Sequence, residues 1–209
     1  IKSLLNYTEY DQVNLFAYMS TSEIYSGLQC NATESTPIVS STQQKRSIYI
    51  ESKRLGEAIT SNLVGNNSTR AVSYRIALAT PPVMIDNDNR VLADLINSGL
   101  KKKKVVLNGG SNLIRQYQYG PNAIYKILGS LINGKATLYN NAGTHVVTLG
   151  ELAMIIAKIL KVDHEIKMHN ADITAPKSVL IDTNLIDCES GYIHSNEKSF
   201  EFYLRKLIP

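Results

Sequence analysis

The sequence has few of the residues from which specialised sites are built. Its two cysteines, Cys30 and Cys188, lie far apart in the chain of 209 residues, without the spacing of a zinc site or a redox pair. Two free thiols are typical of proteins from the reducing cytoplasm. The four histidines share no ligand spacing either, so the sequence predicts no metal site.

Long apolar runs are also missing. No segment has the length of a membrane span, and no charged segment followed by an apolar one forms a secretion signal. We therefore expect a soluble, cytoplasmic protein with no membrane partner. Apolar residues at 44% and charged residues at 19% are typical of a globular protein with a substantial core.

A large excess of charge is absent as well. The formal net charge is +4, and the one dense basic run, residues 101–104, directly follows an apolar helical pattern. Lysines at the carboxyl end of a helix complement its dipole. We therefore expect a solvated helix end there and no nucleic-acid partner.

Strand and helix patterns alternate along the chain, which predicts an α/β fold with a parallel sheet. The first ten residues resemble the end of a helix. Thr148, followed three positions later by Glu151, predicts a capping box at the start of a helix. The predicted strands are 13–20, 70–78, 104–108, 136–140, 164–168 and 178–182, and the predicted helices are 47–64, 89–100, 121–133, 149–161 and 197–207.

One candidate reaction site lies on a predicted helix, in the stretch "YIESKRLGEA" (49–58). Tyr49 and Lys53 are four residues apart, so their side chains share one face of the helix. A free tyrosine has a pKa of about 10, and a nearby ammonium favours the phenolate, which then exchanges a proton with an alcohol or a ketone. The alternative interpretation is an exposed tyrosine beside a lysine.

The stretch "FAYMSTSEIYSG" (16–27) supplies further polar groups at the end of a predicted strand. A hydroxyl of Thr21 or Ser22 is suited to orient the same substrate oxygen as the tyrosine. Glu23 adds a second acid or base beside it. The alternatives are a plain loop, or a Glu23 carboxylate that only hydrogen-bonds within its own loop.

In this order, the motifs resemble the extended short-chain dehydrogenase/reductase family of nucleotide-sugar epimerases, dehydratases and decarboxylases. The resemblance covers nearly the whole chain. The similar segments are "YMSTSEIYSG", "YIESKRLGEA", "AVSYRIALATPP", "VLNGGSNLIRQYQY" and "DTNLIDCESGY".

The resemblance implies a role for each matching residue. Thr21, Tyr49 and Lys53 match the hydroxyl–Tyr–Lys triad, in which the tyrosine and lysine also contact the cofactor. Glu23 matches the acid or base of the dehydratase and decarboxylase branches, which favours dehydration or decarboxylation. Two further residues match substrate-binding positions, Ser22 and Arg115, and the arginine meets the nucleotide diphosphate. The implied cofactor is NAD or NADP, the substrate is a nucleotide-diphosphate sugar, and the assembly is a homodimer or larger.

Three departures from the family pattern qualify these expectations. The glycine-rich fingerprint that anchors the cofactor pyrophosphate is absent, Leu78 replaces a substrate-contacting asparagine, and "YGPN" (119–122) replaces "Y-V-x-D". We therefore expect the C-terminal part of a Rossmann-type fold, with residues 1–78 belonging to the NAD(P)-binding domain and 79–209 forming a small mixed substrate-binding lobe. The alternatives to a part of an intact enzyme are a degenerate binding module or a scaffold subunit without catalysis.

Overall fold

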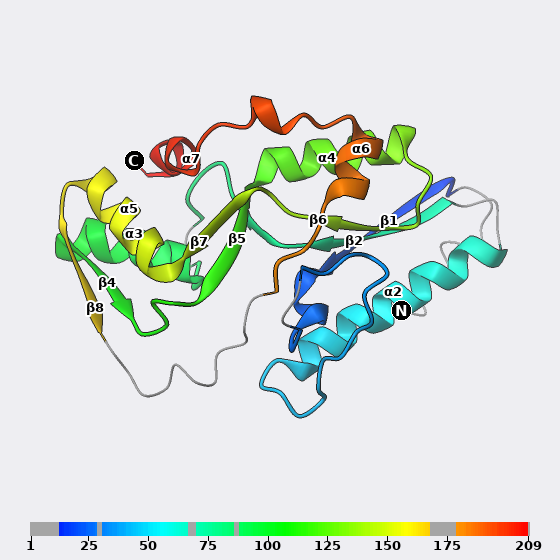
Figure 1. Ribbon diagram of the computed structural model, residues 1–209, viewed down its shortest axis with the longest axis horizontal. Coiled ribbons are helices and arrows are strands. Elements are labelled where there is room, and N and C mark those ends of the chain that lie inside the picture. The colour runs from blue at the N-terminus through cyan, green and yellow to red at the C-terminus, as the bar shows by residue number, and fades with distance from the viewer. Residues whose placement is uncertain (1–12, 29–30, 67–69, 86–87, 168–178, 209) are drawn as a thin grey trace. The chain divides into compact units, whose positions relative to one another are not determined.

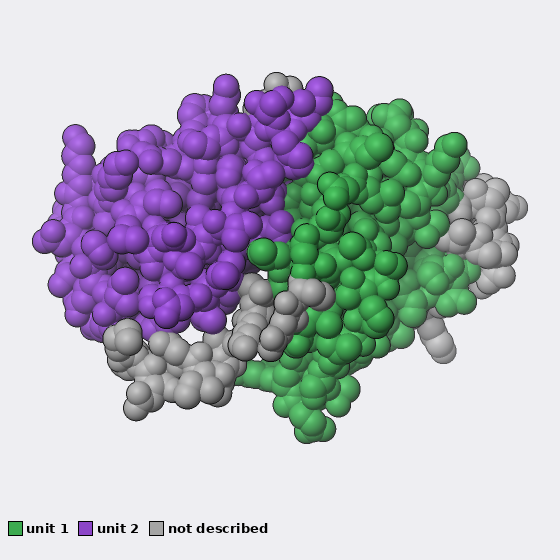
Figure 2. Space-filling view, viewed as in Figure 1, with its two compact units in different colours: residues 1–77, 123–142, 179–192 green, residues 78–122, 143–178, 193–209 purple. Residues whose placement is uncertain are grey.

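The computed structural model describes residues 13–28, 31–66, 70–85, 88–167 and 179–208. The chain forms two compact units, which Figure 2 colours separately. Unit 1 comprises residues 1–77, 123–142 and 179–192, and unit 2 comprises residues 78–122, 143–178 and 193–209. No described helix is both long and apolar enough to cross a membrane.

The first change of unit falls between Ala77 and Leu78. The chain then returns to unit 1 twice, at residues 123–142 and 179–192. The two units therefore share the chain in alternating segments, whereas the sequence analysis divides it into two consecutive parts, 1–78 and 79–209. The assignment of these parts to cofactor and substrate binding stays a prediction.

A parallel sheet forms the centre of unit 1. Its strands follow the order β1-β2-β6, and they are β1 (Leu15–Thr21), β2 (Arg70–Ile76) and β6 (Leu138–Asn141). The first two pair over their whole length, from Leu15 opposite Arg70 to Thr21 opposite Ile76. The carboxyl ends of these strands therefore lie together at one edge of the sheet.

Helices lie on both sides of this sheet (Figure 1). Helix α2 (Ser47–Asn66) is on one side, and α4 (Gly120–Asn133) and α6 (Asn184–Ser190) are on the other. Successive side chains of β2 reach opposite sides, because Arg75 contacts α2 and Tyr74 contacts α4. Burial on both faces explains why the strands of a parallel sheet are nearly continuous apolar runs.

The described residues of unit 2 form two small sheets and three α-helices. One sheet has the order β3-β5-β7, from β3 (Leu78–Thr80), β5 (Ile114–Tyr119) and β7 (His145–Thr148). The other pairs β4 (Lys104–Asn108) with β8 (Asp163–Lys167) in parallel. The helices are α3 (Val91–Lys102), α5 (Leu149–Leu160) and α7 (Phe200–Leu207).

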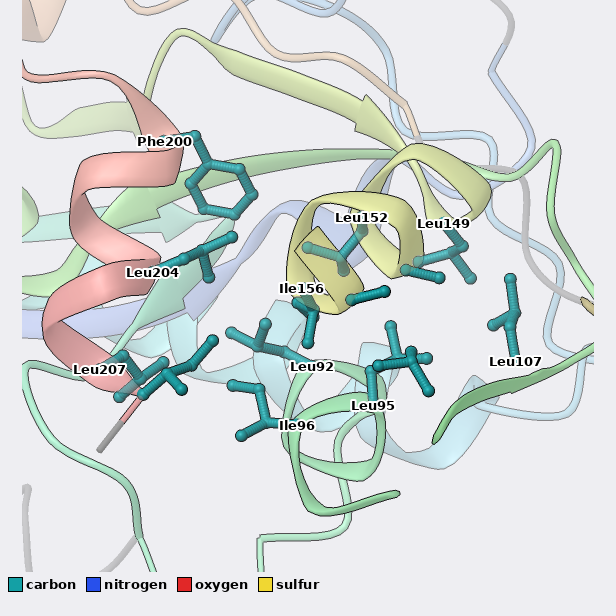
Figure 3. Packing of buried hydrophobic residues seen from close by; sticks show 14 of the residues in the cluster. Leu92, Leu95, Ile96, Leu107, Leu149, Leu152, Ile156, Phe200, Leu204 and Leu207 are labelled. Carbon is teal, nitrogen blue, oxygen red and sulfur yellow. The ribbon is translucent and has the colours of Figure 1, made fainter. Parts of the chain in front are cut away.

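Unit 2 has its own hydrophobic core, which Figure 3 shows between these three helices and β4. Leu95 and Ile96 of α3 pack with Leu152 and Ile156 of α5, and Leu204 of α7 is fully buried in the same cluster. These apolar positions recur at helical spacing in the sequence. Each helix therefore has one apolar face, and burial of that face in the core stabilises it.

Two predicted helix ends are confirmed in detail. Thr148 Oγ1 accepts a hydrogen bond from the Glu151 backbone N–H at 3.1 Å, and the Glu151 side chain accepts one from the Thr148 N–H at 2.8 Å. This is the predicted capping box. The first two residues of the lysine run 101–104 lie in the last turn of α3. Lys103 follows in the left-handed conformation that ends the helix.

Other predictions differ from the structure. The expected strand 70–78 is two strands in two different sheets, because β2 pairs with β6 whereas β3 pairs with β5. The expected strand 178–182 is wrong among the described residues, where Ile181 forms only an isolated bridge with Ala32. Three elements were not expected: β5, β7 and α6. The helix end predicted for residues 1–10 lies outside the described residues.

Candidate active site

The carboxyl end of β1 explains why polar residues follow an apolar strand. Thr21 is the last residue of β1 and caps the 3-10 turn η1 (Ser22–Tyr25), with its Oγ1 accepting the Glu23 backbone N–H at 3.3 Å. The Thr21 side chain is buried. The sequence "STSE" therefore both ends the strand and places hydroxyl and carboxyl groups at the edge of a parallel sheet, where ligands of open α/β sheets bind.

The predicted tyrosine and lysine lie on α2, which packs against β1. Lys53 Nζ donates a hydrogen bond to the Met19 carbonyl oxygen at 2.7 Å, and it lies 6.0 Å from the centre of the Tyr49 ring. Tyr49 is 37% exposed, so its phenol is accessible. Lys53 thus joins the helix that carries Tyr49 to the strand that ends in Thr21.

Glycine at position 56 allows α2 to approach β1 closely. A side-chain carbon there would overlap the ring of Tyr18, which lies across the helix at this point. The Tyr18 ring is 5.4 Å from Lys53 Nζ. Burial raises the pKa of the Tyr18 phenol, and the charge of Glu57 raises it further. Glycine is unfavourable inside a helix, and here the packing of Tyr18 explains its presence.

A buried polar network connects this strand end to the neighbouring elements. Ser20 Oγ donates to Glu57 Oε1 at 2.6 Å, and Arg75 donates to the same carboxylate from Nε at 3.0 Å and from Nη2 at 2.8 Å. Arg75 Nη1 also donates to the Tyr25 hydroxyl at 2.6 Å. The network therefore fixes β1, η1, α2 and β2 to one another around Thr21. Its residues are distant in the sequence, which does not predict it.

A second contact missed from the sequence holds Glu23. Arg46 donates two hydrogen bonds to the Glu23 carboxylate, from Nε at 2.5 Å and from Nη2 at 2.9 Å. The same guanidinium lies 4.8 Å from the centre of the Tyr49 ring. The hydrogen bond to Glu23 raises the pKa of Arg46, so the pair is ionic. The Glu23 carboxylate therefore bonds to a residue of another segment, whereas the Glu23 backbone bonds within its own turn.

The predicted site residues fall into both units. Thr21, Ser22, Glu23, Tyr49 and Lys53 belong to unit 1 and surround the carboxyl end of β1. Arg115, the predicted diphosphate ligand, belongs to β5 of unit 2, where its Nη1 donates to the Ile114 carbonyl oxygen at 2.8 Å. Its role as a phosphate ligand stays a prediction.

The departures from the family pattern at residues 119–122 have a local physical reason. At Gly120, the first residue of α4, an added side-chain carbon would come within 2.8 Å of the Thr80 carbonyl oxygen. Only glycine therefore fits where β3 passes this close. Pro121 is tolerated in the first turn of a helix, and Asn122 Nδ2 donates to the Tyr203 hydroxyl at 3.3 Å.

Neither a metal centre nor a dinucleotide anchor is found within the described ranges. No group of three or more metal-ligating side chains is placed to hold an ion in these residues. None of the described strands enters a helix through a G-x-x-G-x-x-G turn, the element that binds a pyrophosphate. The assignment of Tyr49 and Lys53 to cofactor binding stays a prediction.

Comparison with known proteins assigns the chain. The family model of the NAD dependent epimerase/dehydratase family matches residues 2–131, more than half of the chain. The chain belongs to this family. No curated protein sequence matches it significantly.

Solved structures of this architecture are similar at low sequence identity. One is dTDP-glucose 4,6-dehydratase from Bacillus anthracis with NAD, at a TM-score of 0.80 and 20% identity over 99% of this chain and 64% of that chain. Another is UDP-glucuronic acid 4-epimerase from Bacillus cereus with UDP-glucuronic acid and NAD, at 0.80 and 17% identity over 98% and 65%. A dTDP-glucose 4,6-dehydratase from Streptomyces venezuelae gives 0.77 and 19% over 93% and 58%.

These likenesses confirm the predicted Rossmann-type α/β fold. The chain spans between 58% and 65% of the length of these three structures.

Proposed function

We propose that the whole protein catalyses an NAD-linked reaction on a nucleotide-diphosphate sugar, of the epimerase or dehydratase type. The observation that supports this most is the hydrogen bond from Lys53 to the Met19 carbonyl oxygen, at 2.7 Å. It holds the Tyr49 helix against the strand end that carries Thr21. A hydroxyl, a phenol and an ammonium are thereby grouped at the edge of a parallel sheet, where they suit the oxidation of a sugar alcohol.

In this proposal Tyr49 accepts the proton of a sugar hydroxyl, and Thr21 orients that hydroxyl by hydrogen bonding. Lys53 places its ammonium 6.0 Å from the centre of the Tyr49 ring, where its charge would stabilise negative charge developing during the proton transfer. Tyr49 and Lys53 would hold the nicotinamide and ribose end of the cofactor, which would supply the hydride-transfer chemistry. An ammonium has three N–H donors and the Met19 carbonyl takes one, so the others suit the hydroxyls of the cofactor ribose.

The Glu23 carboxylate favours a reaction with an additional proton transfer. Oxidation of a sugar hydroxyl to a ketone acidifies the neighbouring C–H bonds. Arg46 holds the Glu23 carboxylate through two hydrogen bonds, and in this proposal that carboxylate removes such a proton. We therefore propose dehydration or decarboxylation ahead of simple epimerisation, which needs no second acid or base.

The experiment is product analysis of the whole protein with NAD and a panel of nucleotide sugars that includes dTDP-glucose and UDP-glucuronic acid. We expect conversion of one of them to a 4-keto, a decarboxylated or an epimerised sugar nucleotide, identified by mass spectrometry and NMR. Binding of a nucleotide sugar without conversion of any would refute the proposal. That result would support a scaffold or binding role for the same fold.

A further inference from the structure

Arg46 stands outside the Y-x-x-x-K pattern, yet it contacts both acid–base candidates of unit 1. It directly precedes α2, and its carbonyl oxygen accepts the Ile50 backbone N–H at 3.1 Å. Its backbone is therefore fixed by the start of the helix. Tyr49 follows three residues later, which is one turn away on the same side of the helix.

The planar guanidinium of Arg46 makes two contacts of different kinds, one with the Glu23 carboxylate and one with the Tyr49 ring. Its Nε and Nη2 donate the two hydrogen bonds to Glu23, at 2.5 Å and 2.9 Å, and its central carbon lies over the Tyr49 ring, 4.8 Å from the ring centre. A planar fork is suited to such a combination, because it binds a carboxylate in two places and stacks on an aromatic ring. A lysine at this position would keep the charge but lose the fork.

Without Arg46, the relative position of the two candidates would depend on mobile side chains. Glu23 is held on the turn η1 and Tyr49 on α2, and the Arg46 and Glu23 side chains are 50% and 34% exposed. An exposed carboxylate samples several rotamers unless a partner selects one. Arg46 is that partner for Glu23, through its two hydrogen bonds to the carboxylate.

We propose that Arg46 is a positioning residue that holds the Glu23 carboxylate beside the Tyr49 ring, so that the second proton transfer occurs where the first has taken place. This inference rests on the proposed function, since it assigns Arg46 to the step that uses Glu23. A misplaced catalytic group loses rate even when binding is unchanged, so the effect belongs in kcat more than in KM.

The test compares Arg46→Gln and Arg46→Lys with Arg54→Gln. Arg54 is a matched control on the same helix, paired with Glu51 at 3.0 Å with side chains 38% and 37% exposed. Carbodiimide-driven amidation of carboxylates, mapped by peptide mass spectrometry, reports the contact in the chain without any need for turnover. We expect both Arg46 variants to label Glu23 about two- to fivefold faster, whereas Arg54→Gln accelerates only Glu51.

Turnover of the whole protein then reports the role. We expect Arg46→Gln to lower kcat by about 10- to 100-fold with KM within about twofold, and Arg46→Lys not to restore it. Unchanged labelling of Glu23 would overturn the inference, and so would faster labelling with normal kcat or full rescue by Arg46→Lys. An inactive wild-type protein whose Glu23 labelling still depends on Arg46 would refute the proposed function and, with it, the positioning role.

Discussion

The Glu23 carboxylate separates the alternative reactions at the scale of single residues. It accepts both hydrogen bonds of the Arg46 fork, and the same guanidinium lies 4.8 Å from the centre of the Tyr49 ring. In the proposed function, a carboxylate in this position removes a proton from a sugar carbon after oxidation. An epimerase that only removes and returns hydride does not use it.

We predict that Glu23→Gln leaves the initial hydride transfer largely intact and slows the later step by about 10²–10⁴-fold, which is the usual contribution of a positioned acid or base. Rapid mixing of the whole protein with its nucleotide sugar should show NADH absorbance that rises and then persists, while product formation stalls. Normal product formation by Glu23→Gln would assign the carboxylate a structural role and favour the epimerase alternative.

At this scale, the sequence predicted the residues that form a local pattern. Tyr49 and Lys53 are one helical turn apart, and Thr21 directly ends an apolar strand, so their grouping follows from periodicity. Arg46 and the Glu57–Arg75 pair were missed because their contacts join segments that are distant in sequence. An arginine and an aspartate or glutamate in different segments give no periodic signal before the fold is known.

At the scale of elements, a buried ion pair joins α4 to α6. Lys126 of α4 is 1% exposed, and its Nζ lies 2.7 Å from Asp187 Oδ1 and donates to the Ala142 carbonyl oxygen at 2.8 Å. The ammonium also lies 4.6 Å from the centre of the Tyr192 ring. Each charge compensates the other in a region with little water.

We predict that Asp187→Ala lowers the free energy of unfolding by about 3–5 kcal/mol, because it leaves a buried ammonium without its counter-charge. The double variant Lys126→Met, Asp187→Leu should be close to wild type, since it removes both charges and keeps apolar volume. Urea denaturation measures both. A small effect of Asp187→Ala, similar to that of Lys104→Met in the exposed Lys104–Glu165 pair, would show that the buried pair contributes little.

His145, at the start of β7, gives unit 2 a pH dependence. It stacks on Phe200, with ring centres 5.3 Å apart, and its Nε2 lies 3.5 Å from the buried Glu197 carboxylate, which His194 also approaches. Burial lowers the pKa of His145, and the charge of Glu197 partly opposes this. The folded state therefore binds a proton less readily than the unfolded chain does.

Linkage sets the sign of the expected effect. The unfolded chain takes up a proton as pH falls below 6.5, the ordinary pKa of histidine. The free energy of unfolding therefore decreases as pH falls through that range. We predict that His145→Gln makes the free energy of unfolding less dependent on pH between about 7 and 5.5. The exposed His164 provides the control, and an equal change in His164→Gln would contradict the assignment.

The elements themselves were largely predictable, and the exceptions have physical causes. Helices such as α5 bury one face and carry a capping box, so both their pattern and their start are visible in the sequence. β5, with the sequence IRQYQY, was missed because five of its six residues are not aliphatic and the sequence does not alternate between a clear apolar and a polar face. The sequence predicts a single strand over 70–78. In the structure the Ala77 N–H donates to the Asn141 carbonyl oxygen of β6, and the next residues join another sheet.

At the scale of the whole molecule, the described residues contain only part of a dinucleotide site. In the proposed function, Tyr49 and Lys53 would hold the ribose and nicotinamide end, whereas a glycine turn for the pyrophosphate is not found among the described residues. The three similar structures, each solved with NAD, are longer than this chain. The contacts that hold the phosphates contribute much of the affinity for a dinucleotide.

We therefore predict that the 209-residue chain by itself binds NAD weakly or not at all. Isothermal titration calorimetry with the purified chain should give no saturable heat at micromolar NAD. Saturable micromolar binding would mean that other backbone amides replace the glycine turn, and the proposed division of cofactor contacts would be wrong.

The measurement that tests the account most directly is turnover of a nucleotide sugar by Tyr49→Phe, compared with wild type in the whole protein. In the proposed function the Tyr49 phenol accepts the sugar proton. The kcat of Tyr49→Phe should therefore fall by about 10²–10⁴-fold with folding unchanged. Tyr125→Phe, at another exposed tyrosine of unit 1, should keep full activity. Full activity of Tyr49→Phe would contradict the account, because the proton would then be taken by a group other than this tyrosine.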